Sequence, residues 1–209
     1  ALRRHHSENR HNHSDIGGDM ERMGFGDTAI ANIEATRGLS SLFSIGTKWD
    51  FECYDKDGNL KWGERNRPNI VTHEGLDALL NIMFNASTQI TTWYVAPVET
   101  DTTAAATMTY ASPVFTESTA YTEANRQEYV EAAASSQSIT NSANKATFTC
   151  NATKTFYGAA LFGGGTDANT KGDTAGGGTL FCYSKFSSGK AVESGDTFKI
   201  TITITAAHA

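Results

Sequence analysis

Residues 197–205 read Thr-Phe-Lys-Ile-Thr-Ile-Thr-Ile-Thr, and apolar and polar side chains alternate along them without interruption. A period of two is typical of a β-strand with one buried face, because successive side chains point to opposite sides of a sheet. Phe198, Ile200, Ile202 and Ile204 then share one face, and the threonines share the other. We predict that this strand carries its four large apolar side chains into a core.

A second alternating stretch, Lys48–Tyr54, places Trp49, Phe51 and Cys53 on one face. The residues after it, Asp55–Asn59, are typical of a tight turn because Gly58 and Asn59 tolerate a positive φ. Leu60–Arg65 then runs back. We therefore predict a β-hairpin here.

Other short segments also indicate strands. The run at 156–162 is apolar almost throughout, as expected for a strand covered on both faces. Two long segments are predicted as surface loops: the Thr- and Ala-rich residues 99–112, and the glycine-rich hairpin loop at 163–178, which we expect to be flexible. The remaining predicted strands are residues 69–72, 90–98 (ended by Pro97), 126–132, 145–151 and 180–186.

One segment has a helical period. Its apolar residues fall at i, i+3, i+4, i+7 and i+8, which form one stripe: Leu76, Leu79, Leu80, Met83 and Phe84. Thr72 is the candidate N-cap, and Glu74 suits the positive end of the helix dipole. The chain is therefore predicted to be mainly β: a β-sandwich or jelly-roll-like body (residues 47–209) with one short packed α-helix.

Residues 1–46 form the predicted extended N-terminal arm. The segment begins with arginines and histidines, and glycines then separate its few apolar residues. Such a composition lacks the apolar surface that would offset the entropy cost of ordering the chain. We expect a neighbouring subunit to hold the arm, through Arg3, Arg4, Arg10, Ile16, Met20, Met23, Phe25, Ile30 and Ile33.

Composition excludes several classes of function. The net charge is −6, which argues against nucleic acid as the partner of the body. No apolar run approaches the roughly 18 residues of a membrane-spanning helix, and no signal peptide is visible. The chain begins at Ala1, as a cytoplasmic product would after loss of an initiator Met. Its three cysteines, Cys53, Cys150 and Cys182, are an odd number with wide spacing, so we predict buried thiols rather than disulfides.

No motif predicts catalysis or a cofactor. The glycine loop runs from strand to strand and lacks the Gly-Lys-Ser/Thr of a phosphate-binding loop. Asp55, Asp57 and Asn59 resemble the opening of a calcium loop, but the glycine and glutamate of such a loop are misplaced, so a turn is favoured. His5, His6, His11 and His13 can bind metal only incidentally. We therefore predict a protein that is not an enzyme and holds no metal.

Two further alternatives concern side chains that only the fold can bring together. The carboxylates Glu117, Glu123, Glu128 and Glu131 are spread over strand and loop, and a converging pair would be needed for acid–base chemistry. Trp49, Trp62 and Trp93 suit a core better than a sugar-binding platform. A glycan-binding module would instead need exposed aromatic residues near 99–112 or 163–178.

The residues that form the hairpin and helix also carry a resemblance. The chain resembles a family of small structural virion proteins of tailed bacteriophages. The stretches that carry the resemblance are residues 48–62, 69–80, 93–95, 121–126, 141–146 and the C-terminal segment from Gly195 onward. The resemblance covers most of residues 47–205 but not the arm. Most members have Gly-Leu where this chain has Ala96-Pro97, a difference that we expect to alter a turn.

The resemblance implies a non-enzymatic virion protein that is assembled in the host cytoplasm. With the arm, it favours a capsid decoration (cement) protein that clamps neighbouring subunits, with the major capsid protein or other virion subunits as partners. We also expect a homo-oligomer, with no specific nucleic acid and no membrane. A neck or tail connector ring, and a head or tail fibre component that binds host glycan, remain alternatives.

Overall fold

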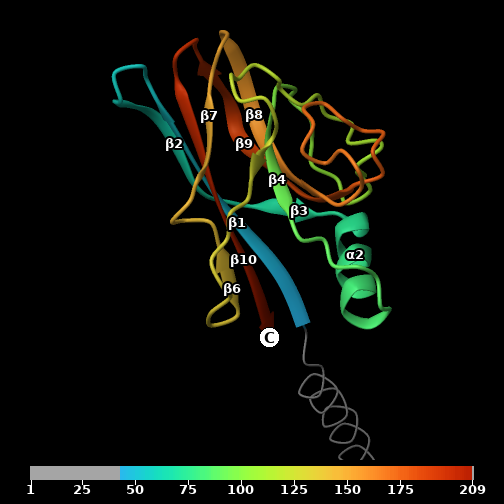
Figure 1. Cartoon of the computed structure of the whole chain (residues 1–209). Helices are drawn as coiled ribbons and strands as arrows, with labels where there is room; N and C mark the ends of the chain where they lie inside the picture. Colours follow the sequence, from blue (N-terminus) through green and yellow to red (C-terminus); the bar gives the residue numbers. More distant parts are fainter. Residues whose placement is uncertain (1–42, 209) are drawn as a thin grey trace, which may run out of the picture. The chain divides into compact units, whose positions relative to one another are not determined.

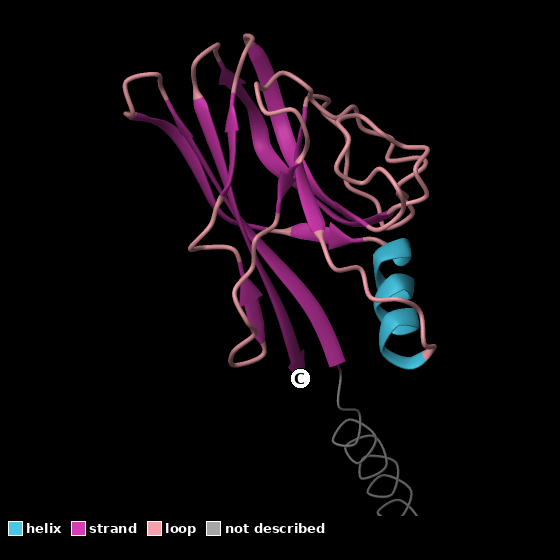
Figure 2. Cartoon of the chain, viewed as in Figure 1, coloured by secondary structure: helices cyan, strands magenta, loops and turns pink. Residues whose placement is uncertain are grey.

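The structure is a computed structural model, and it describes residues 43–208 (Figure 1). Within this range the chain is mainly β with one helix, which confirms the predicted fold class (Figure 2). In chain order the elements are β1 (Phe43–Tyr54), β2 (Leu60–Arg67), β3 (Asn69–Val71), α2 (His73–Phe84), β4 (Trp93–Val98), β5 (Gln127–Glu128), β6 (Ser138–Thr140), β7 (Ala146–Thr149), β8 (Lys154–Gly163), β9 (Thr179–Val192) and β10 (Thr197–His208).

The strands form two five-stranded sheets. The first has the order β2-β1-β10-β6, and β7 pairs with the other half of β10. The second has the order β3-β9-β8-β4-β5. In the first sheet β2 runs antiparallel to β1, and both β6 and β7 run antiparallel to β10. Figure 2 shows the long strands of both sheets, with the helix at one end.

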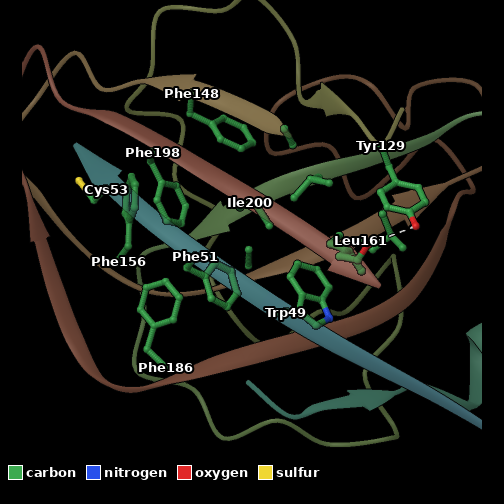
Figure 3. Packing of buried hydrophobic residues seen from close by; sticks show 14 of the residues in the cluster. Trp49, Phe51, Cys53, Tyr129, Phe148, Phe156, Leu161, Phe186, Phe198 and Ile200 are labelled. Carbon is green, nitrogen blue, oxygen red and sulfur yellow. Dashed lines mark hydrogen bonds between the residues drawn. The ribbon is translucent and has the colours of Figure 1, made fainter. Parts of the chain in front are cut away.

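The main core contains side chains from both sheets (Figure 3). The alternation predicted for the last strand is confirmed, because Phe198, Ile200 and Ile202 are all buried. The same is true of Trp49, Phe51 and Cys53 on β1. From the second sheet the core receives Phe156, Ala159, Leu161, Cys182 and Phe186. The two-sheet sandwich thus follows from the period-two pattern of its longest strands.

Phe198 lies at the centre of an aromatic cluster in this core. Its ring centroid is 5.3 Å from that of Phe156, 5.6 Å from Trp62 and 6.1 Å from Phe51. These centroid distances are within the range in which aromatic pairs attract each other beyond the effect of the buried area. Trp49 is fully buried, and Trp62 and Trp93 pack against the same core. The prediction that the tryptophans are core residues is therefore confirmed.

A second apolar cluster covers the opposite face of the β4-β8-β9 sheet. Ala160 and Phe162 of β8 and Leu180 and Tyr183 of β9 point into it. Loop residues complete the cluster: Met108, Tyr110, Phe115 and Ala168. This confirms that the apolar run of β8 is covered on both faces. It also corrects the prediction for residues 99–112, which are not a plain surface loop because Met108 and Tyr110 are buried.

The β1–β2 hairpin is confirmed, with Cys53 opposite Trp62 and Tyr54 opposite Leu60. In its turn, one Asp55 carboxylate oxygen accepts hydrogen bonds from the backbone N–H of Asp57 at 2.9 Å and of Asn59 at 2.8 Å. Gly58 has a φ of 84°, which favours glycine. The turn therefore accounts for these acidic residues.

Three predicted element boundaries are wrong. Pro97 does not end its strand but lies inside β4, opposite Ala159 of β8. It is tolerated because its carbonyl points away from β8 and accepts a hydrogen bond from the backbone N–H of Ser118 at 2.9 Å, so the missing N–H lies on that side and does not interrupt the pairing with β8. The predicted turn change at Ala96-Pro97 is therefore wrong as well. The strand expected over 126–132 is only Gln127–Glu128, and that expected over 90–98 begins at Trp93.

The start of the body also differs from its predicted position. Strand β1 begins at Phe43, so residues 43–46 of the predicted arm belong to the first sheet. Residues 1–42 lie outside the described residues. Within residues 43–208 no helix is long and apolar enough to cross a membrane.

We predict that Phe198→Ala lowers the free energy of unfolding by about 3–5 kcal/mol, because it leaves a cavity among the aromatic rings. The matched control is Phe84→Ala, since Phe84 is 81% exposed. At low protein concentration the control changes stability by less than about 0.5 kcal/mol. Urea unfolding followed by circular dichroism measures both. Equal losses in the two variants would contradict the burial that separates them.

The three cysteines are buried and free, as predicted. Burial raises the pKa of each thiol to about 12, with the carboxylate of Asp196 adding to the effect at Cys53 and Cys150. We predict that a thiol reagent at mildly alkaline pH labels none of them in the native protein and all three after unfolding. Mass spectrometry of the labelled chain checks this. Rapid labelling of the folded protein at any of these cysteines would contradict it.

Candidate functional site: a buried loop network and an apolar helix face

Helix α2 begins where the chain leaves β3, and Thr72 is its N-cap as predicted. The Thr72 hydroxyl accepts a hydrogen bond from the backbone N–H of Gly75 at 2.9 Å and donates to the carbonyl of Leu180. Gly75 faces β9 so closely that a Cβ atom there would lie 2.6 Å from the carbonyl oxygen of Phe181. The first turn is therefore fixed directly to the backbone of β9.

Glu74 has a more specific role than the predicted interaction with the helix dipole. Its carboxylate accepts hydrogen bonds from the backbone N–H of Leu180 at 2.6 Å and of Tyr110 at 2.8 Å. One side chain thus joins the helix, strand β9 and the loop after β4. Sequence analysis missed this role because the partners are backbone groups 36 and 106 residues away.

The predicted packing of the apolar stripe on α2 is wrong for most of its residues. Leu76 is 37% exposed, Leu80 54%, Met83 64% and Phe84 81%. Only Leu79 of the stripe is turned toward the body, where it lines an apolar cavity with Trp93 and Phe181. The close contact at Gly75 fixes which side of the helix meets β9 and leaves the stripe facing solvent. We call Leu76, Leu80, Met83 and Phe84 the apolar helix face.

The cavity beside Leu79 has a volume of about 190 Å³. Its lining is almost wholly apolar and comes from both sheets as well as from the helix: Ile45, Leu79, Trp93, Tyr129, Leu161, Phe181 and Ile204. Ile45 lies near the start of β1, and Ile204 lies in the second half of β10. The apolar surface of α2 therefore continues into the body at the end where β1 begins.

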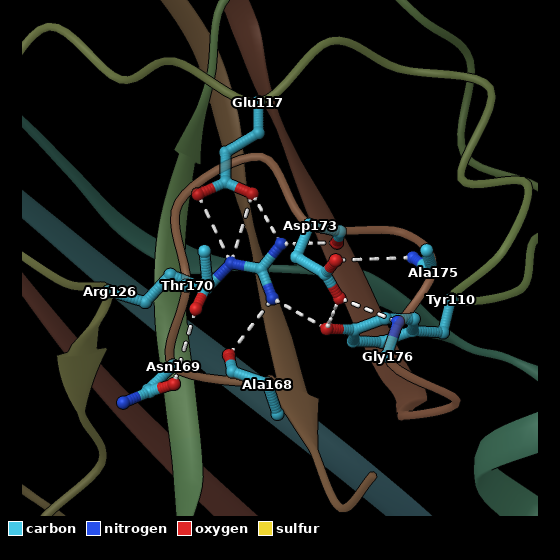
Figure 4. A network of polar contacts seen from close by, with 9 residues as sticks. All are labelled: Tyr110, Glu117, Arg126, Ala168, Asn169, Thr170, Asp173, Ala175 and Gly176. Atoms are coloured by element: carbon cyan, nitrogen blue, oxygen red, sulfur yellow. Dashed lines mark hydrogen bonds and ion pairs between the residues drawn. The ribbon is translucent and has the colours of Figure 1, made fainter. Parts of the chain in front are cut away.

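A second feature is the polar network around Arg126, which is 2% exposed (Figure 4). Its guanidinium donates to both carboxylate oxygens of Glu117, with the shortest contact, from Nη2, at 2.6 Å. It also donates to the backbone carbonyls of Ala168 at 2.9 Å and Asp173 at 2.8 Å. The guanidinium carbon lies 4.0 Å from the centroid of the Phe162 ring. The N–H donors of this buried guanidinium therefore have acceptors, and one of its faces lies against an aromatic ring.

Tyr110 and Asp173 extend the network. The Tyr110 hydroxyl donates to the Asp173 carboxylate at 2.7 Å, and that carboxylate also accepts from the backbone N–H of Gly176 at 2.9 Å. Burial and the bond to Asp173 raise the pKa of Tyr110 to about 12. Burial raises the pKa of Glu117, and its contacts with Arg126 oppose that rise. The network thus joins the loop before Arg126 to the glycine-rich loop between β8 and β9.

The glycine-rich loop is the hairpin connection that the sequence predicted, but it is attached at several points. Arg126 holds its backbone at Ala168 and Asp173. The Lys171 ammonium donates to the carbonyl of Tyr121 at 2.7 Å. Nothing in the local sequence pointed to Arg126 as this anchor, because its four partners are distributed over two loops. An unexplained arginine in an otherwise acidic and neutral segment was the only signal.

The structure does not bring the four predicted carboxylates together. Glu117 is bound to Arg126, and Glu123 accepts from the backbone N–H of Thr149 at 3.0 Å. Glu128 and Glu131 are exposed on separate positions. These contacts are structural, and they give no pair of carboxylates placed for acid–base chemistry.

The aromatic residues expected of a glycan-binding module are not exposed at the two loops. Tyr110 and Phe115 are buried in the second cluster. Beside the glycine-rich loop lies an uncharged groove of about 460 Å³, with Tyr94, Ile90, five residues of the glycine-rich loop and several threonines in its lining. The groove presents hydroxyl and amide groups to solvent, but only Tyr94 provides an aromatic surface.

The predicted partner-binding residues of the arm, and the histidines at its start, lie outside the described residues. Among residues 43–208 there is no group of three or more His, Cys, Asp or Glu side chains arranged to hold a metal ion. His73, at the start of α2, is exposed. The candidate sites that the structure does describe are therefore the apolar helix face and the surfaces built on the Arg126 network.

The described body is thus a two-sheet sandwich whose buried polar groups hold its loops, and four of the seven exposed large apolar residues among residues 43–208 lie on one helix. A family model described as podophage GP4 fiber I protein gp80 matches residues 72–206, well over half of the chain. The chain belongs to this family and is a structural protein of a tailed-phage virion. No curated protein matches its sequence. The predicted resemblance to tailed-phage virion proteins is thus confirmed at the level of a structural protein.

We predict that Arg126→Met lowers the free energy of unfolding by about 3–5 kcal/mol, because Glu117 is left buried and unpaired. Adding Glu117→Met in the same chain restores most of this stability, since no buried charge remains. Chemical denaturation of the parent, the single and the double variant measures the effect. A double variant as unstable as the single one would contradict the explanation.

The same variants separate the ion pair from the anchoring of the loop. Both lack the hydrogen bonds from Arg126 to Ala168 and Asp173, so trypsin should cleave after Lys171 faster in both than in the parent. The rescue by Glu117→Met should therefore appear in stability and not in cleavage of the loop.

Proposed function

We propose that this protein is a non-enzymatic subunit of a virion fibre in a tailed phage. The observation that carries the proposal is the family match over residues 72–206. This range runs from the N-cap of α2 into the last residues of β10, so it includes the helix, strands β4, β5, β8 and β9 of the second sheet, and both loops of the Arg126 network. The part of the chain with the most unusual surface is thus the part that a fibre family shares.

The physical character of the body supports a load-carrying role. The β4-β8-β9 sheet is covered on both faces, and its outer loops are held by buried ionic and backbone contacts. Such a body keeps its shape when it is part of a larger assembly, because local opening would expose two apolar clusters. The buried carboxylates and the arginine are used in these contacts, which fits a protein that does no chemistry.

The N-terminal residues 1–42 supply the attachment in this proposal. They precede a strand of the rigid body and carry the predicted partner-binding residues, which lead to other virion subunits. A segment of this kind spreads its contacts over neighbours and adds avidity without a core of its own. Capsid decoration, which the sequence analysis favoured, would use the arm in the same way. The family match favours a fibre over decoration.

The test is to locate the chain in intact particles. We expect electron cryomicroscopy, with an epitope tag at the C-terminus, to place the chain in fibres that extend from one vertex or from the tail. The copy number by quantitative mass spectrometry should be that of a few fibres. A labelled major capsid protein serves as the internal standard. Copies at every local symmetry axis of the shell would overturn the fibre assignment and establish decoration.

A further inference from the structure

The apolar helix face is the most unusual surface of the described body. Its four residues lie between Leu76 and Phe84 of α2 and recur at i, i+4, i+7 and i+8, so they form one patch. Single exposed apolar residues are ordinary, but a contiguous patch marks a surface that another molecule covers. Phe84 and Met83, at 81% and 64% exposed, are the most exposed residues of this patch.

The patch is extended by the cavity at its base. Leu79 lines that cavity and is an i±3 or i±4 neighbour of both Leu76 and Met83. Ile45, Trp93, Phe181 and Ile204 also line the cavity. An apolar segment that lay along the helix face could therefore also insert a side chain into about 190 Å³ of apolar space.

The chain contains one segment whose chemistry matches this surface. Residues 16–33 carry six well-spaced apolar side chains and have no neighbouring sequence with which to form a core: Ile16, Met20, Met23, Phe25, Ile30 and Ile33. Methionine and phenylalanine suit an irregular apolar surface, because they are large and methionine adapts its shape. An exposed patch and an apolar segment outside the described residues therefore occur in the same chain.

We propose that residues 16–33 of one copy bind the apolar helix face of a second copy. This inference rests on the proposed function, and it names the partner of the N-terminal segment as another subunit of the same fibre. Every copy then has one donor segment and one acceptor helix. Such a head-to-tail contact joins subunits in a ring or a row, whereas a self-complementary contact would stop at a dimer.

The length of the chain before β1 allows a second copy to be the acceptor. Residues 34–42, when extended, span about 30 Å. That distance is about twice the 15 Å radius of gyration expected for a body of this size. The segment can therefore reach past its own body to a neighbour. Residues 1–15, with Arg3, Arg4 and Arg10, then extend further and remain available for other virion subunits.

The test uses disulfide trapping between two full-length chains with different tags, one with Met23→Cys and one with Met83→Cys. Under mild oxidation we expect a mixed disulfide between the two tags on a non-reducing gel. The native thiols give little background because all three are buried. The matched control pairs Met23→Cys with Asp57→Cys. Asp57 is exposed in the β1–β2 turn, at the far end of the 12-residue strand β1.

A double variant, Met23→Cys with Met83→Cys in one chain, separates the two sources of the segment. If its disulfide is mainly intramolecular and the mixed disulfide is absent, the segment belongs to the same chain and the proposal is overturned. Absence of both disulfides overturns it as well, as does a mixed disulfide that forms equally with the Asp57→Cys control.

A second measurement needs no cysteine. Sedimentation of the full chain should show association that Leu80→Asp weakens by about tenfold or more, the factor that corresponds to loss of one buried apolar side chain. Asn81→Asp introduces the same charge one residue away on the polar side of α2 and should leave association unchanged. A parent chain that stays monomeric, or equal effects of the two variants, would overturn the proposal.

These experiments use the isolated protein, whereas the fibre assignment is tested by location in the particle. A chain that lies in the fibre but gives no trapped pair leaves the fibre assignment intact and removes this contact. If the pair is trapped but the chain is found over the whole shell, this contact stands and the fibre assignment is removed.

Discussion

Strand β8 is buried on both faces, and most other features of the body keep those two faces from water. On one face Ala159 and Leu161 meet the first sheet across the aromatic core. On the other, Ala160 and Phe162 are covered by loops. Loops shield an apolar sheet face from water only when other contacts hold them in place, because their backbone polar groups need hydrogen-bond partners and their conformational entropy opposes order. The body therefore depends on how its second face is held.

Arg126 provides that restraint at a considerable electrostatic cost. Removing a guanidinium and a carboxylate from water costs more than their mutual attraction returns unless every remaining donor is used. Here the remaining donors bind the carbonyls of Ala168 and Asp173. The guanidinium of Arg126 thus holds two loops in position. Glu74 makes a similar connection between α2, β9 and Tyr110 with backbone amides as donors. A fibre or other virion subunit that must keep its shape in an assembly benefits from such cross-links.

The same arrangement explains the exposed helix face. Gly75 contacts the backbone of β9, and Glu74 and Thr72 bind residues of the same strand. These contacts fix the rotation of the helix about its axis before any apolar residue of the stripe is considered. The stripe is consequently turned toward solvent, where it is available to a partner. Amphipathic periodicity identifies which residues share a face, but it does not say whether the body or another molecule covers that face.

The sequence alone was sufficient for several features that depend on local periodicity. The alternation of Phe198, Ile200 and Ile202, the turn at Asp55–Asn59, the N-cap at Thr72 and the double burial of 156–162 follow from neighbouring residues, because strand and helix geometry set which side chains share a face. The partners of Arg126 and Glu74, the burial of Tyr110, the place of Pro97 inside β4 and the exposure of Phe84 did not follow. Each depends on groups far away in the chain that meet only when the two sheets and their loops are assembled, and local patterns carry no information about which distant groups those are.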